Sequence, residues 1–117
     1  MSLVHPIGYL ERTDFNKSGD FMGNKPVFIM LQNEKCGYCQ IAKPAFQALA
    51  NEGIISCMTI QTDGVRKSER DIKMILDKIY PDMEGFPSYL LYTQNKRIPY
   101  RDGRSTSELR EFILQHS

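Results

Sequence analysis

Residues 34–40 read EKCGYCQ and place Cys36 and Cys39 three positions apart. An apolar run at residues 27–31 (VFIML) precedes them, and residues 41–50 follow with the apolar spacing of a helix. The stretch therefore joins a predicted strand to a predicted helix. A Cys-x-x-Cys pair at such a junction indicates a thiol–disulfide centre. The first cysteine would lie at a helix N-terminus, where unpaired N–H groups and the helix dipole favour a thiolate.

The composition is that of one globular domain. The chain has 117 residues, of which 41% are hydrophobic and 25% charged, and its net charge is +1. This length allows one core, so we expect a single domain over residues 1–117 and a monomer. The nearly neutral charge gives no reason to expect nucleic acid or a membrane as a partner. No apolar segment reaches the roughly 20 residues that span a bilayer.

The N-terminal residues lack the charged-then-apolar pattern of a secretory signal. We therefore expect a cytoplasmic protein, although the alternative of a native leader removed ahead of Met1 stays open. Three cysteines are too few for a disulfide scaffold, so the cysteine count does not decide the compartment.

Strand and helix patterns alternate along the chain. Prolines at Pro6 and Pro99 favour edge positions for the first and last strands, because proline removes a ladder donor. Gly53 is the expected end of the helix that follows the cysteines. Strands are predicted at residues 3–10, 27–31, 54–60, 88–92 and 96–100, and helices at residues 15–22, 36–52, 68–80 and from 105 onward, the last two opened by capping boxes.

This order of elements resembles the thioredoxin fold. Pro44 stands five residues after Cys39, where that family has the kink proline of its active-site helix. Residues 85–88 (GFPS) match a family segment whose proline is cis and lies against the disulfide. Residues 100–104 (YRDGR) resemble a segment of protein disulfide isomerase catalytic domains. The resemblance is strongest over residues 26–113 and implies an α/β fold with helices flanking a central mixed sheet.

The resemblance implies an enzyme that reduces, forms or isomerises disulfides in protein substrates. Cys36 is the expected nucleophile, and Cys39 the resolving thiol that attacks a mixed disulfide. Arg104 matches an arginine that is thought to lower the pKa of the second thiol in disulfide isomerases. The expected partners are protein thiols and disulfides and an unidentified reductant or oxidant. The expected substrate-binding residues are Gly37, Tyr38, Phe86 and Pro87, with Tyr38 and Phe86 as exposed aromatics beside the disulfide.

Two positions depart from the family pattern. Lys35 stands where the family usually has tryptophan; a lysine favours a nearby thiolate, although a solvated one contributes little. Met30 stands where the family has a buried acid that helps to take the proton from the second cysteine. Deprotonation of Cys39 therefore needs another group, for which Arg104 is the candidate. Pro44 is expected to shape the site without touching the substrate.

Two other interpretations stay open. Glutaredoxins carry Pro-Tyr between their cysteines, and Tyr38 shares the tyrosine, so a glutathione-dependent enzyme is one alternative. A thioredoxin-fold binding or chaperone module with an incidental disulfide is the other, because Lys35 and Met30 differ at positions that the family uses.

No prosthetic group or metal is expected beyond glutathione as a possible co-substrate. A zinc site needs about four ligands, and Cys57 with His5 or His116 would complete one poorly. Cys57 is instead expected to be a small buried hydrophobic residue in its strand.

Overall fold

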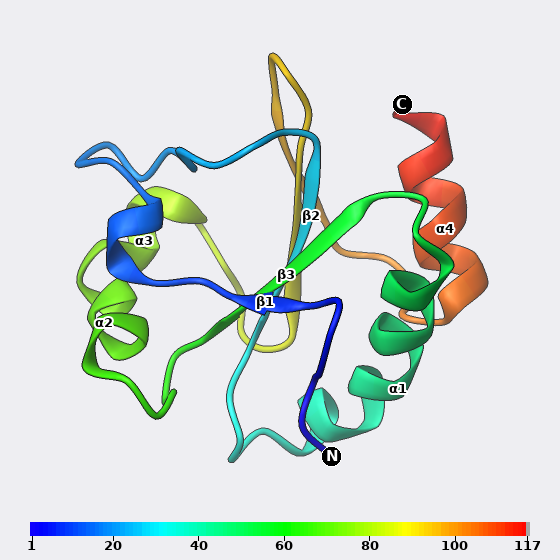
Figure 1. The fold of residues 1–117 in the computed structure, drawn as a ribbon, viewed down its shortest axis with the longest axis horizontal. Coiled ribbons are helices and arrows are strands. Elements are labelled where there is room, and N and C mark those ends of the chain that lie inside the picture. The colour runs from blue at the N-terminus through cyan, green and yellow to red at the C-terminus, as the bar shows by residue number, and fades with distance from the viewer. Residues whose placement is uncertain (117) are drawn as a thin grey trace.

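The computed structural model describes residues 1–116 and arranges them around one five-stranded mixed sheet (Figure 1). The order across the sheet is β1-β3-β2-β4-β5. The first three strands run parallel, while β4 is antiparallel to β2 and β5 is antiparallel to β4. This topology confirms the predicted fold class. The strands are β1 (Gly8–Tyr9), β2 (Val27–Gln32), β3 (Ser56–Gln61), β4 (Ser88–Tyr92) and β5 (Arg97–Tyr100).

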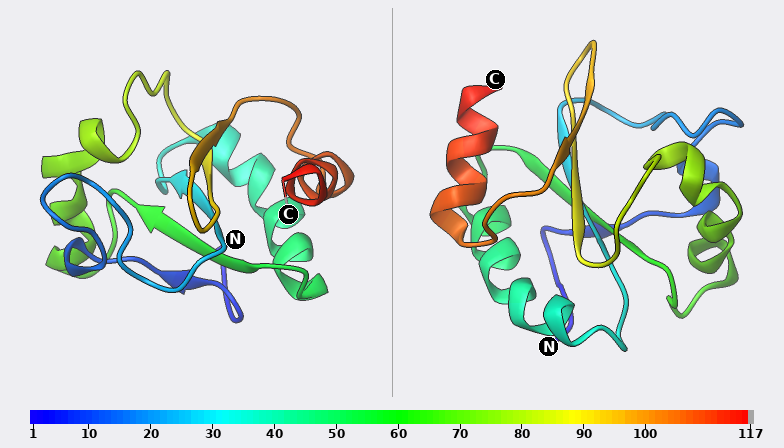
Figure 2. Two further views of the ribbon diagram at one scale, coloured as in Figure 1. Left: turned by 90° about the horizontal axis from the view of Figure 1, so that it is seen from above. Right: turned by 180° about the vertical axis from the view of Figure 1, so that it is seen from behind.

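Helices cover both faces of the sheet, as the views in Figures 1 and 2 agree. One layer holds the two long helices, which pack side by side, and the other holds short helical segments. Each layer closes its own apolar core against the sheet. The long helices are α1 (Gly37–Glu52) and α4 (Thr106–Gln115); the short segments are η1 (Arg12–Asp14), α2 (Lys67–Arg70), η2 (Asp71–Ile75) and α3 (Leu76–Ile79).

Strand β2 lies at the centre of the sheet and is buried at every residue. Side chains alternate between the two faces of a strand, so Phe28 and Met30 enter the core beneath α1 and α4 while Ile29 and Leu31 enter the other core. The continuous apolar run at residues 27–31 is therefore explained by burial on both faces.

The predicted limits of α1 and the predicted start of α4 are confirmed. Gly53 ends α1 with φ of 73°, a left-handed conformation that glycine adopts without steric cost. Ser105 and Glu108 form the capping box of α4: the Ser105 hydroxyl oxygen accepts the N–H of Glu108 at 3.2 Å, and the Glu108 carboxylate accepts the N–H of Ser105 at 3.4 Å.

The predicted helix at residues 15–22 is wrong. Phe15 and Phe21 pair as an isolated antiparallel bridge, and both rings are buried in the second core. The side-chain oxygen of Asn16 accepts the backbone N–H of Ser18 at 2.9 Å, which stabilises a turn in place of a helix. Helical structure is confined to η1, just before this segment.

The predicted continuous helix at residues 68–80 is also wrong, because η2 interrupts it between α2 and α3. The capping residue differs as well. The carboxylate of Glu69 accepts the backbone N–H of Arg66 at 3.0 Å, whereas the hydroxyl of Ser68 donates to Glu11 at 2.6 Å. The isoleucines predicted on the inner face (Ile72, Ile75 and Ile79) are nevertheless buried.

The predicted edge strand at residues 3–10 shortens to the two residues of β1. The chain ahead of it is tied to α1 instead, since the side chain of Gln47 accepts the N–H of Val4 at 2.8 Å and donates to the carbonyls of Val4 and His5. The N-terminal segment is therefore part of the packing around α1.

Candidate active site

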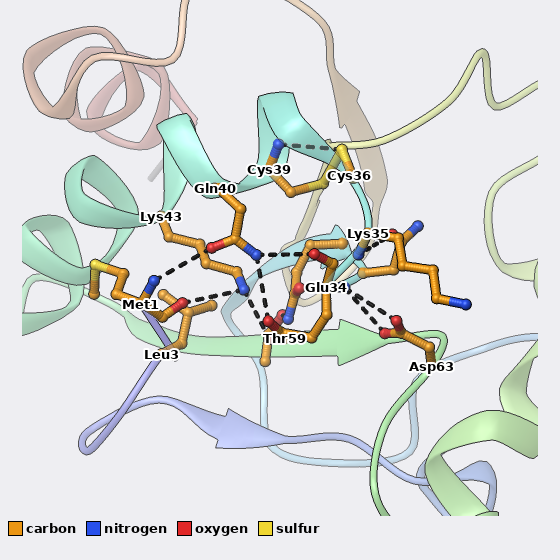
Figure 3. Close-up of polar contacts among 12 residues, drawn as sticks. Met1, Leu3, Glu34, Lys35, Cys36, Cys39, Gln40, Lys43, Thr59 and Asp63 are labelled. Carbon is orange, nitrogen blue, oxygen red and sulfur yellow. Dashed lines mark hydrogen bonds and ion pairs between the residues drawn. A yellow bond between two sulfur atoms is a disulfide. The ribbon is translucent and has the colours of Figure 1, made fainter.

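The two cysteines lie at the first turn of α1 and are joined by a disulfide (Figure 3). Cys36 is the N-cap residue, and its sulfur accepts the backbone N–H of Cys39 at 3.1 Å. Cys36 is half-buried, whereas Cys39 is completely buried. A sulfur that caps a helix receives the N–H groups and the dipole that stabilise a thiolate. The geometry thus separates an accessible sulfur from an enclosed one.

The loop ahead of β4 lies against the accessible sulfur. The peptide between Phe86 and Pro87 is cis, as predicted, and Pro87 is buried. The carbonyl oxygen of Phe86 lies 3.4 Å from the sulfur of Cys36. Segments 50 residues apart in the chain are thereby brought together at one sulfur.

The exposed apolar surface beside the disulfide differs in part from the prediction. Tyr38 is 70% exposed, but Phe86 is half-buried and packs against the second core. Ile41, which belongs to the apolar pattern of residues 41–50, is 77% exposed. Tyr38 and Ile41 are three residues apart on α1 and therefore share a helix face. Gly37 has open space around it, and Lys35 is exposed.

Arg104 is exposed and lines a cavity of about 280 Å³ together with Phe86, Pro87 and Tyr89. Burial raises the pKa of the Tyr89 hydroxyl to about 12, and the charge of Arg104 acts in the opposite direction. Within residues 1–116, no hydrogen bond or ion pair joins Arg104 to Cys39. The structure thus brings Arg104 to the proline loop but shows no contact with the resolving sulfur.

Met30 is completely buried, and its apolar side chain occupies the position of β2 where the family pattern has a carboxylate. A polar pair stands at the start of α1 instead. Lys43 is completely buried, and its ammonium lies 3.0 Å from a carboxylate oxygen of Glu34. Sequence patterns did not single out this pair, although a lysine four residues after Cys39 is a signal that helical spacing could have supplied.

Cys57 is a buried free thiol in β3, as predicted. Burial raises its pKa to about 12, so it remains protonated at neutral pH and unreactive as a nucleophile. Among residues 1–116, no group of three or more His, Cys, Asp or Glu side chains is arranged to hold a metal ion. In the same part of the chain, no helix combines the length and apolar character needed to cross a bilayer.

Comparison with known proteins relates the whole arrangement to one family. No family model matches the chain. The sequence is 38% identical over 110 residues to the thioredoxin-like protein 453L of Invertebrate iridescent virus 6, an alignment that covers 80% of each protein.

Solved structures at lower identity share the fold. Human ERp44 superposes with a TM-score of 0.70 at 15% identity, covering 97% of this chain and 31% of that one. The J-Trx1 fragment of ERdj5 gives 0.69 at 20% identity, with 94% of this chain and 51% of that one covered. Thioredoxin f2 of Chlamydomonas reinhardtii gives 0.67 at 19% identity and matches over nearly the full length of both, 95% and 96%. With the viral relative at 38% identity and these folds in agreement, the chain belongs to the thioredoxin-like family.

Proposed function

We propose that the protein exchanges disulfides with protein substrates through Cys36 and Cys39. The environment of the Cys36 sulfur carries this proposal, because the sulfur caps α1 and lies against the carbonyl of Phe86. The helix terminus favours its thiolate. Partial exposure lets a substrate reach Cys36, while the burial of Cys39 reserves that thiol for attack from within.

In the reducing direction, the thiolate of Cys36 attacks one sulfur of a substrate disulfide. The substrate S–S bond breaks, a bond between Cys36 and the substrate forms, and the other substrate sulfur leaves as a thiolate. Cys39 then attacks the Cys36 sulfur, which closes the Cys36–Cys39 disulfide and releases the second substrate sulfur. Two electrons have passed to the substrate, and an external dithiol reduces the pair again. The reverse steps form a disulfide in a substrate.

The surroundings of Cys36 suit a flexible polypeptide as the substrate. Tyr38 and Ile41 offer an exposed apolar surface on the first turns of α1, the helix that Cys36 caps. In the loop that lies against the sulfur, no hydrogen bond within residues 1–116 uses the backbone N–H of Phe86. An extended substrate segment can therefore pair with Phe86 as an added strand.

The comparison of two substrates tests this proposal. We expect the protein to accelerate reduction of insulin by dithiothreitol well above the uncatalysed rate, and to act more weakly on a mixed disulfide of glutathione with a small thiol. Both rates are measured on the same preparation at the same protein concentration. A strong preference for the glutathione disulfide would contradict the proposal and favour a glutathione-dependent enzyme.

The reduction potential of the pair decides the direction of transfer. The potential is measured by equilibration with glutathione. A value of about −270 mV would assign a reductant, whereas a value of about −120 mV would assign an oxidant. The cytoplasmic location and the monomeric state stay predictions from the sequence.

We propose that Arg104 assists ionisation of Cys39 from the proline-loop cavity, which Arg104 lines together with Phe86 and Pro87. Replacement of Arg104 by alanine should leave alkylation of Cys36 unchanged and slow insulin reduction roughly two- to fivefold, the scale of an exposed charge. Arg101→Ala is the matched control, because Arg101 lines the same cavity but is engaged by Tyr80 and Glu84. Equal turnover in wild type and Arg104→Ala would remove Arg104 from the mechanism.

A further inference from the structure

A completely buried lysine lies one helical turn beyond the disulfide. The side chain of Lys43 is 0% exposed, and that of its partner Glu34 is 46% exposed. Lysine is almost never fully buried unless its charge is paired. The Lys43 ammonium donates to Glu34 at 3.0 Å and to the carbonyl oxygen of Met1 at 3.3 Å. These two are the polar contacts that hold it within the described part of the chain.

Lys43 shares a helix face with Cys39. The two residues are four apart in α1, and both are completely buried. Side chains of an α-helix lean toward its N-terminus, so the stem of Lys43 runs back toward the turn that carries Cys39. Figure 3 shows this course, with the ammonium directed toward Glu34 at the entrance to α1. Lys43 and Cys39 thus lie on the same buried side of α1.

The two charges of the pair are screened unequally. Water surrounds part of the Glu34 carboxylate, whereas the Lys43 side chain is completely buried. The charge of Lys43 is therefore screened less than that of Glu34. Met30, across the core, contributes no charge that would oppose it.

The other charged and titratable groups around the pair cluster at Glu34. Its backbone N–H donates to both carboxylate oxygens of Asp63 at 3.1 and 3.2 Å. Its carboxylate accepts the side-chain amide of Gln40 at 3.3 Å, and the N-terminal ammonium donates to Gln40. On β1, the pKa of Tyr9 is raised by burial and, to a smaller extent, by the charge of Glu34. The negative charges thus gather on the solvent side, and Lys43 remains the buried cation.

We propose that Lys43, held in place by Glu34, is a positioning residue for the resolving step and stabilises the thiolate of Cys39 during its attack on the mixed disulfide. This inference rests on the proposed function. In that step the S–H bond of Cys39 breaks and its proton passes to solvent. A bond forms between the sulfurs of Cys39 and Cys36, the bond from Cys36 to the substrate breaks, and its electron pair leaves with the substrate thiolate. A cation from α1 thus serves where the family pattern has a carboxylate at the position of Met30.

The test follows the two thiols separately with dithiobis(nitrobenzoate) as the probe. Attack by Cys36 on the reagent releases one coloured thiolate, and attack by Cys39 on the resulting mixed disulfide releases a second. Stopped-flow absorbance of the fully reduced protein therefore gives one phase for each cysteine, and each phase is recorded as a function of pH.

Replacement of Lys43 by methionine keeps an apolar stem of similar length and leaves Glu34 in contact with water. We expect Lys43→Met to keep the first phase within about twofold and to slow the second about tenfold at neutral pH. In the pH profile of the second phase, the midpoint should rise by about one pH unit, because a tenfold change in the ionisation constant of a thiol corresponds to one pKa unit. Gln47→Met is the matched control: Gln47 lies one turn further along α1 and ties down the same N-terminal segment without a charge. It should leave both phases within about twofold.

A second variant should not raise the pH midpoint of the second phase. Glu34→Gln keeps an oxygen that can accept from the Lys43 ammonium and hold it in place, but removes the negative charge. The pH midpoint of the second phase should therefore stay or fall, and this test does not depend on the folding of Lys43→Met. A second phase slowed by Glu34→Gln in the manner of Lys43→Met would overturn the inference, since the pair would then act only structurally. So would an unchanged second phase in Lys43→Met, while the proposed function would stand. Absence of the first phase in the wild-type protein would instead contradict the proposed function.

Discussion

Replacement of Cys36 by serine should abolish disulfide reduction, lowering the rate of insulin reduction roughly a thousandfold or more. A serine hydroxyl does not ionise near neutral pH, so the helix terminus has no thiolate to stabilise, and loss of a nucleophile removes the whole covalent pathway. Cys39 cannot take over, because it is completely buried. The measurement is insulin reduction by dithiothreitol with equal amounts of folded protein.

Two further cysteine variants complete this experiment. Cys39→Ser retains the nucleophile but cannot resolve, so it should accumulate a mixed disulfide with insulin that mass spectrometry detects and dithiothreitol removes. Cys57→Ala should behave as wild type, since Cys57 is a buried thiol that remains protonated. Full biological activity in Cys36→Ser would show that the protein works by binding alone, as a thioredoxin-fold module with an incidental disulfide.

Replacement of Phe28 by alanine should lower the free energy of unfolding by about 3–5 kcal/mol. Phe28 is completely buried in β2, and its ring stacks on Tyr89 with centroids 5.7 Å apart. It also meets Phe46 of α1 at 6.0 Å and Phe112 of α4 at 6.2 Å. The cavity left by alanine would therefore lie where the central strand meets both long helices. In a domain whose total stability is about 5–15 kcal/mol, this loss is a large fraction.

Urea unfolding of the oxidised protein, followed by circular dichroism, measures this change. Phe28→Leu should cost less than Phe28→Ala, because it retains most of the buried volume. Met74→Ala is the surface control and should change the stability by less than about 0.5 kcal/mol, since Met74 is 74% exposed. A loss below about 1 kcal/mol in Phe28→Ala would contradict the central place of this ring in the core.

Local rules predicted the elements whose signals lie close together in the sequence. The apolar run of β2 reflects the burial of that strand on both faces. The capping box reflects reciprocal hydrogen bonds between Ser105 and Glu108, three residues apart. The helix predicted at residues 15–22 failed because two aromatic rings gain more by entering a core built by distant strands than the backbone gains from a helix. Burial that depends on residues far apart in the chain cannot be predicted from a local sequence pattern.

The site shows the same division. The family pattern placed the two cysteines and the cis proline, which depend on the course of the backbone. Exposure was less predictable, because Phe86 turns against the second core and Ile41 turns to solvent. Lys43 escaped notice because its burial depends on cover from Glu34 and from the N-terminal segment, neither of which helical spacing reveals.

The buried thiol of Cys57 can report transient opening of the structure around β3. In the oxidised molecule Cys57 is the one cysteine outside a disulfide among residues 1–116, and it is 4% exposed. A labelling reagent can reach it only when β3 is transiently uncovered. When labelling is faster than reclosing, the rate at which label accumulates on this sulfur equals the opening rate of β3, with no engineered reporter.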